Sequence, residues 1–260
     1  MALTKVIGRG LGVQGDTVTG DDAALGFTSA EGLIITGQGS TNDVTIKNDA
    51  DTQVCGVPTG TDDLRFPDNA QLQLGTGGDF KIYHDATNNN ILGNGSHPMR
   101  FYTNDTLALK IDTNGIITKP LQPAFFVQRS ATQSNISNAA GHVTVTFDTE
   151  IFDQNADFAS NTFTAPVTGK YFLSINTYLA AIDTAAGYIL IGIRTSNRDY
   201  YRIFDPNFSA DVNYYGMNFS VLADLDASDT AFIWWQSNGG TAQVDIIAAN
   251  GTQFQGCLLS

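Results

Sequence analysis

The chain has 260 residues, of which 42% are hydrophobic and 10% aromatic, so it holds enough apolar material for a packed core. Its formal net charge is −13, from 26 acidic and 13 basic residues, and the sequence has no cluster of Lys or Arg. This charge balance excludes the counterion-displacing surface that nucleic acid requires. We expect no nucleic-acid partner.

The acidic residues are nearly all Asp, with Glu only at Glu31 and Glu150. Asp favours turns and Glu favours helices, so the bias points away from a helical fold. The segment MALTKVIGRG lacks the apolar run of a signal peptide, and no run of about 18 apolar residues occurs. We therefore expect neither Sec export nor membrane insertion.

Glycines and aromatic residues divide the chain into two parts. Residues 1–119 hold 17 of the 26 glycines but only 6 of the 27 Phe, Tyr and Trp residues. A large core therefore belongs to the second part. In the first part, Gly8 to Gly12 has the glycines of a phosphate loop without the Lys or the following helix, so we predict an attachment segment over 1–30.

The region 31–119 reads as short apolar stretches separated by Gly, Asn and Asp. Alternation within each stretch predicts strands at 32–36, 43–47, 71–74, 80–83 and 107–111. Each such strand buries only a narrow apolar ridge, so one copy cannot build a thick core. We predict a slender β-rich trimeric shaft in which copies close each other's edges around a common axis.

Pro120 and Pro123 favour extended backbone and predict a short stiff joint, which sets the start of a second domain over 120–260. Longer strands rich in aromatic residues follow, separated by polar turns. The stretch 179–186 is interpreted as a loop between two of them. The predicted strands are 124–129, 142–148, 169–178, 188–194, 214–223, 230–236, 243–249 and 254–259.

Six residues of the second domain match a known signature: Phe147, Asp153, Phe158, Phe163, Gly169 and Tyr171. The stretch from 147 to 171 thereby resembles the C1q-like domain, although the gap between Phe158 and Phe163 is two residues shorter than in that family. The resemblance spans about 124–260 and implies a C1q/TNF-like jelly-roll sandwich that assembles as a trimer and binds without catalysis. The six residues are the expected core or trimer positions.

The first part also resembles other proteins. The stretches 42–51 and 78–85 are similar to segments of structural and fibre proteins of tailed bacteriophages. A Gly/Asn/Asp-rich shaft with a C1q-like head is a plan of phage appendages. The resemblance implies a virion protein that is assembled in the host cytoplasm and attaches to other virion proteins through its N-terminal segment.

The sequence offers little for catalysis or cofactors. His84 and Asp85 are neighbours in a predicted strand, so their side chains point to opposite faces, and no nucleophile elbow is present. Clustered acids lack the spacing of known calcium loops, and turns are the favoured interpretation, although Ca²⁺ stays an alternative. These acids are Asp21, Asp22, Asp62, Asp63, Asp224, Asp226 and Asp229, together with Asp205 and Asp211.

Two cysteines, Cys55 and Cys257, match no metal or redox spacing and are expected to be free buried thiols. Three aromatic pairs should each send one ring to the core and the other outward or to a subunit contact, and outward rings also suit sugar binding. The pairs are Tyr200 with Tyr201, Tyr214 with Tyr215, and Trp234 with Trp235.

The leading hypothesis from the sequence is a non-enzymatic, homotrimeric virion fibre whose head adheres to a host surface receptor or glycan. A capsid decoration or cement protein is the alternative, since it shares the trimer. A glycan-cleaving tailspike-type enzyme is less favoured because it needs paired carboxylates in a groove.

Overall fold

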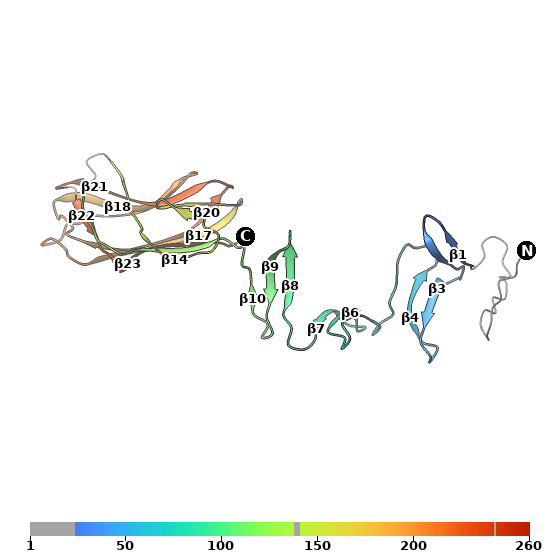
Figure 1. Ribbon diagram of the computed structural model, residues 1–260. Helices are drawn as coiled ribbons and strands as arrows, with labels where there is room; N and C mark the ends of the chain where they lie inside the picture. The colour runs from blue at the N-terminus through green and yellow to red at the C-terminus, as the bar shows by residue number, and fades with distance from the viewer. Residues whose placement is uncertain (1–23, 138–140, 242) are drawn as a thin grey trace, which may run out of the picture. The chain divides into compact units, whose positions relative to one another are not determined.

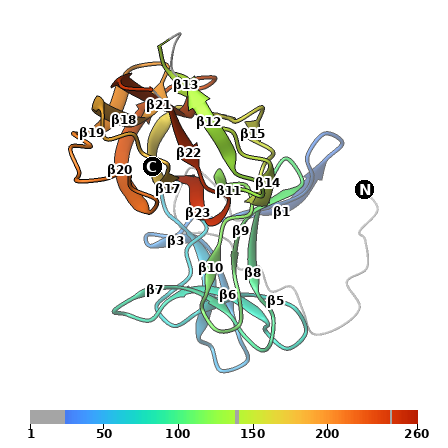
Figure 2. The same cartoon turned by 90° about the vertical axis from the view of Figure 1, so that its left-hand side faces the viewer.

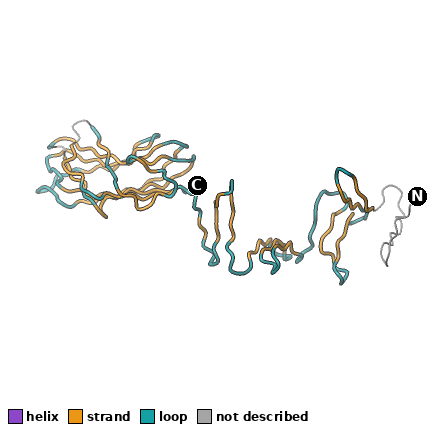
Figure 3. Tube along the Cα trace, in the orientation of Figure 1, coloured by secondary structure: helices purple, strands orange, loops and turns teal. Residues whose placement is uncertain are grey.

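A computed structural model describes residues 24–137, 141–241 and 243–260, and within these ranges the chain forms strands and turns with no helix (Figure 1, Figure 3). The predicted all-β class is confirmed, and no described segment supplies a helix that could cross a membrane. The described chain splits into two compact units, one running to Met99 and including 112–115, the other comprising 100–111 and 116–260. A domain start at Pro120 stays a prediction.

The first unit contains three small antiparallel sheets that share no strand: β1 with β2, β3 with β4, and β5-β6-β7. A further sheet, in the order β10-β9-β8, follows along the chain (Figure 2). The bounds are β1 (Ala24–Thr28), β2 (Gly32–Thr36), β3 (Asn42–Lys47), β4 (Gln53–Pro58), β5 (Gln71–Leu74), β6 (Phe80–His84), β7 (Asn89–Gly93), β8 (Met99–Thr103), β9 (Thr106–Ile111) and β10 (Ile117–Thr118).

Asn and Asp set the tight turns of these sheets. Between β8 and β9, Asn104 and Asp105 have φ of 47° and 58°, the pair of positive values that a two-residue type I′ turn requires. Asn and Asp tolerate this left-handed region better than most residues with a Cβ. The many Asn and Asp residues in this part of the chain therefore allow short hairpins between the strands.

The second unit contains a sandwich of two sheets (Figure 1). The larger sheet has the order β12-β22-β17-β23-β11-β14, with β20 also paired to β17. Its strands are β11 (Ala124–Arg129), β12 (Gln133–Ser137), β14 (Thr149–Asp153), β17 (Gly169–Ala180), β20 (Tyr215–Leu225), β22 (Gln243–Ile246) and β23 (Ala249–Leu258). The predicted jelly-roll-like sandwich is confirmed.

The smaller sheet has the order β15-β16-β21-β18-β19, with β13 also paired to β21. Its strands are β13 (Val143–Thr144), β15 (Phe158–Ala159), β16 (Thr162–Thr164), β18 (Ala186–Thr195), β19 (Asp199–Phe204) and β21 (Thr230–Gly239). The core lies between the two sheets. On β17, for example, Tyr171, Leu173 and Ile175 are at most 1% exposed, while Phe172 between them faces outward.

The predicted strand 142–148 is partly wrong. Only Val143 and Thr144 pair, as β13 of the smaller sheet, and the chain then leaves to enter the larger sheet as β14. Between these two strands 145–148 is irregular, although Val145 and Asp148 still donate their N–H groups to the carbonyls of Ile233 and Gln128, at 2.9 Å and 3.2 Å. Side chains accept the two N–H groups between them: Thr146 donates to Gln133 Oε1 at 3.2 Å and Phe147 donates to Asn161 Oδ1 at 2.6 Å.

The stretch 179–186, predicted as a loop, contains the connection between β17 and β18, but Leu179, Ala180 and Ala186 belong to these strands. Residues 181–185 form a loop, and Ile182 within it is fully buried and pairs with Val212. Asp183 accepts the N–H of Ala185 at 2.8 Å and so fixes the turn. The apolar residues of this stretch therefore cover one end of the sandwich core.

Candidate functional site

The signature aromatics meet in one cluster inside the sandwich. Phe125 stacks on Phe158 and Phe163, with ring centroids 5.3 Å and 4.7 Å away, and Phe254 meets Phe125 edge-on at 4.9 Å. Phe147 also lies beside Phe158, at 6.3 Å. Each of these rings is buried. They hold the two sheets together and are not available to a ligand.

The other three signature residues fix the backbone around this cluster. Asp153 accepts the N–H groups of Asp157 at 3.0 Å and Phe158 at 2.8 Å, so its carboxylate caps the loop before β15. Tyr171 donates its hydroxyl to the carbonyl of Val167 at 2.7 Å. A Cβ on Gly169 would lie 2.7 Å from the Ser260 carbonyl oxygen. A trimer role for the signature residues stays a prediction.

The first unit has almost no core of its own. Among the residues whose burial is described, Cys55 and Pro58 are the only buried apolar side chains before Pro123. Leu72, Ile82 and Ile91 are paired across β5, β6 and β7 and form one apolar row, yet they are 46%, 44% and 60% exposed. This row lines a pocket of about 470 Å³. An exposed apolar face of this kind is a candidate contact surface.

The second unit also exposes apolar side chains, on the outer face of its larger sheet. Phe172 of β17 is paired with Leu222 of β20, and Phe126 of β11 with Phe152 of β14. Leu222 is 65% exposed and Phe152 50% exposed. Further along the strands, Ser, Asn and Gln take over this face, as in the pairs Ser174 with Ser220, Asn176 with Asn218, and Ser174 with Gln255. This outer face is a candidate subunit contact.

The outer face of the smaller sheet carries an ordered cluster around Trp234. The Arg194 guanidinium lies 5.0 Å from the centre of the indole, the His142 ring meets the indole edge-on at 5.9 Å, and Tyr201 does so at 6.3 Å. Arg194 also donates to both carboxylate oxygens of Asp199, at 2.6 Å and 2.8 Å. Trp234 is thus covered, while Tyr201 remains 51% exposed.

Gly192 makes this arrangement possible, and replacing it with Ala should disrupt the cluster. A Cβ at Gly192 would lie 2.5 Å from Trp234 Nε1 and 2.8 Å from the Tyr200 carbonyl oxygen, so the indole must move. We expect a loss of about 1 to 3 kcal/mol in the free energy of unfolding, measured by chemical denaturation. Gly187→Ala in the same strand is the control, because its nearest neighbour is 3.4 Å away; equal losses in both variants would contradict the prediction.

The aromatic pairs separate as alternation predicts. Tyr215 and Tyr200 pack against the core, while Tyr214 is 79% exposed and lies beside Tyr178. Trp235 is fully buried in the core. Trp234 faces outward but is only 4% exposed, because charged and aromatic neighbours from three other segments cover it. The sequence did not predict that His142 and Arg194 cover Trp234, because these two residues are 52 positions apart.

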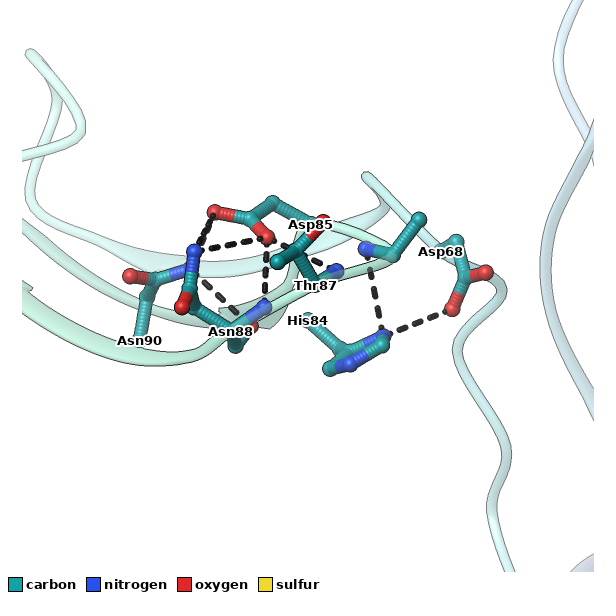
Figure 4. Close-up of polar contacts among 7 residues, drawn as sticks. Asp68, His84, Asp85, Thr87, Asn88 and Asn90 are labelled. Carbon is teal, nitrogen blue, oxygen red and sulfur yellow. Dashed lines mark hydrogen bonds and ion pairs between the residues drawn. The ribbon is translucent and has the colours of Figure 1, made fainter.

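His84 and Asp85 do not form a catalytic pair (Figure 4). His84 Nδ1 lies 2.9 Å from Asp68, whereas Asp85 turns away and closes the turn that follows β6. Asp85 accepts the N–H groups of Thr87 at 3.0 Å and Asn88 at 2.7 Å, and the amide of Asn90 at 2.9 Å. Both residues therefore organise a hairpin.

Acidification should open this turn. Hydrogen bonds, chiefly from the Asn88 N–H and the Asn90 amide, lower the pKa of Asp85 from 3.8 to about 2. Because the pKa is lower in the folded chain, the contribution of Asp85 to stability is complete above pH 4 and is lost as the pH falls through 2. NMR titration should show the Thr87 and Asn88 amides shifting with a midpoint near pH 2, and Asp85→Asn should abolish that transition. A midpoint near pH 4 would contradict it.

Several of the clustered acids have partners within the described residues. Asp229 accepts the N–H of Asp226 at 2.8 Å, Asp224 pairs with Arg198 at 2.9 Å, and Asp211 accepts from Thr184. No three His, Cys, Asp or Glu side chains gather as a metal-binding group in the ranges that the structure describes. Asp21, Asp22 and most of the predicted attachment segment lie outside the described residues. Turn acids without a bound metal stay the prediction, with Ca²⁺ as the alternative.

Both cysteines are free thiols, as expected. Cys55 is buried, at 8% exposure, in the first unit. Cys257 is only half-buried, because it lies on the outer face of β23, opposite Phe172 of β17. The expectation of burial therefore holds fully for Cys55 and partly for Cys257.

Neither a family model nor a curated protein matches the chain. Among solved structures, it is similar to the globular domain of the zebrafish complement 1qA protein, with 19% identity over 54% of this chain and 98% of that chain, at a TM-score of 0.40. It is also similar to murine APRIL in two structures, at pH 8.5 and pH 8.0, each with 12% identity over 53% of this chain and 99% of that chain, at a TM-score of 0.39.

Proposed function

We propose that the protein is a non-enzymatic homotrimeric fibre of a virion, in which the first unit forms an interwound shaft and the second a head that adheres to a host surface. The observation that carries this proposal is the exposed apolar row Leu72, Ile82 and Ile91, in a unit whose described part buries little besides Cys55. Such a face becomes stable when copies of the same chain cover it.

Three copies suit this geometry. The sheet of β5, β6 and β7 has one apolar face, and three copies of that face can meet around an axis so that each chain contributes one wall. The head supports the same arrangement, because its larger sheet exposes Phe172 and Leu222 as a second apolar area. The C1q-like signature of the sequence implies a trimer as well. Burying such faces contributes about 25 cal/mol for each Å² removed from water.

Adhesion by a trimer needs only weak individual sites. Three identical heads held by one shaft bind a surface together, and the effective concentration of the second and third site raises the overall affinity by about 10² to 10⁴. A catalytic role has little support, since the His84–Asp85 neighbours serve a turn and the acids that could pair in a groove cap loops.

The proposal is tested by competition. Purified trimer should occupy receptors on host cells and reduce adsorption of virions that carry the protein, and antibodies against the head should do the same. A decoration or cement role predicts the opposite: the protein would lie on the capsid, adsorption would be unchanged without it, and the capsid would become less stable. Unchanged adsorption in both experiments would overturn the adhesive function.

A further inference from the structure

The outer face of the smaller sheet combines an exposed ring with a fixed polar corner. Tyr201 and Ile203 of β19 are 51% and 58% exposed, and β18 pairs with β19 so that Leu190 lies opposite Ile203 and Arg194 opposite Asp199. We call these residues, together with His142, the Tyr201 face. Because strand alternation places Tyr201, Ile203 and Asp199 on one side of β19, the ring and the corner are presented together.

The ring of Tyr201 rests on a rigid base. Trp234 packs closely against Gly192 and meets Tyr201 edge-on, and the Arg194 guanidinium lies over the indole ring. These contacts leave Trp234 only 4% exposed and limit its motion, and Trp234 in turn supports the Tyr201 ring. A ligand that stacks on Tyr201 therefore meets a preorganised surface, which reduces the entropy lost on binding.

The polar corner is electrically balanced. Arg194 donates to Asp199 through Nε and Nη2, and its Nη1 lies 2.8 Å from His142 Nε2. The charges of the guanidinium and the carboxylate cancel. The guanidinium nevertheless has five N–H donors and each carboxylate oxygen has two lone pairs, so both groups can form a further hydrogen bond. Hydroxyl groups both donate and accept and need no counter-charge, so they suit this corner.

We propose that the Tyr201 face binds a neutral sugar ring of a host-surface glycan, with the C–H face of the sugar on Tyr201 and Ile203 and its hydroxyls on Arg194 and Asp199. This proposal rests on the proposed adhesive function and names its ligand class. Acidic sugars are disfavoured because Asp199 already neutralises Arg194 and the chain carries a net charge of −13.

The test uses the full-length protein on two sets of immobilised glycans: neutral hexose and N-acetylhexosamine oligomers, and uronate-containing polymers. Wild type should bind members of the neutral set only. Tyr201→Ala should weaken that binding by about tenfold, the loss expected when a stacked aromatic ring worth ~1.4 kcal/mol is removed. Tyr201→Phe keeps the ring and should stay within about twofold of wild type. Tyr214→Ala, which removes an even more exposed tyrosine elsewhere, should bind as wild type.

Light scattering on every variant separates loss of a sugar contact from loss of assembly. Wild-type affinity in Tyr201→Ala, binding confined to uronate polymers, or no binding to either set would each overturn the proposal. A different result tests the adhesive function itself: if the wild-type protein does not bind host cells at all, the adhesive fibre hypothesis is wrong. If both wild type and Tyr201→Ala bind host cells equally, adhesion stands and the Tyr201 face is not its site.

Discussion

Ile82→Asp is expected to dissociate the proposed trimer. In a single chain Ile82 is 44% exposed, so an Asp side chain there would be tolerated. In the proposed shaft each of the three chains would instead bury one Asp carboxylate in the apolar contact between subunits. An uncompensated buried charge costs about 3 to 5 kcal/mol, enough to shift assembly by more than a hundredfold. Light scattering across a dilution series measures this directly, as a fall in mass at concentrations where wild type stays assembled.

The matched control for this experiment is Gln73→Asp. Gln73 lies on β5 of the same sheet but on the opposite face from Leu72 and Leu74, so the control carries the same charge and the same low strand propensity. It should leave the mass unchanged. If Ile82→Asp also keeps the wild-type mass, the apolar row is not an intersubunit contact.

Phe125→Ala should be the most damaging substitution in the head. Phe125 is 1% exposed and contacts Phe158, Phe163 and Phe254, so its removal leaves a cavity between the sheets that rigid strands cannot close. The expected cost is about 3 to 5 kcal/mol, which for a unit of this size lowers Tm by roughly 10 °C. Calorimetry of the full-length variant measures the shift.

Ile203→Ala is the comparison for Phe125→Ala. It also removes a large apolar side chain from a strand, but Ile203 is 58% exposed, so the expected cost is within about 1 kcal/mol. Similar Tm values for the two variants would mean that the aromatic cluster does not hold the sandwich together.

Much of the fold follows from local patterns in the sequence. Alternation located β17 almost to the residue, because its inward side chains are all apolar or, like Thr177, hydrogen-bonded within the core. Asn, Asp and Gly marked the turns because they tolerate positive φ, as Asn104 and Asp105 do. The poor core of the first unit followed from its scarcity of aromatic residues.

What local patterns miss depends on pairing across long separations. The irregular segment 145–148 reads as a strand, since nothing in Val145 to Phe147 reveals that the chain changes sheets there. The corner of Arg194, Asp199 and His142 was also beyond local patterns. The spacing of Arg194 and Asp199 is compatible with an ion pair across the hairpin of β18 and β19. The position of His142, however, depends on the pairing of β13 with β21.

The solution mass of the full-length chain tests the central claim most directly. Multi-angle light scattering on purified protein at micromolar concentration should give three times the chain mass of 27.8 kDa. A mass of 27.8 kDa that persists as concentration rises would contradict the trimer, because Leu72, Ile82 and Ile91 would then be exposed to water in the native protein.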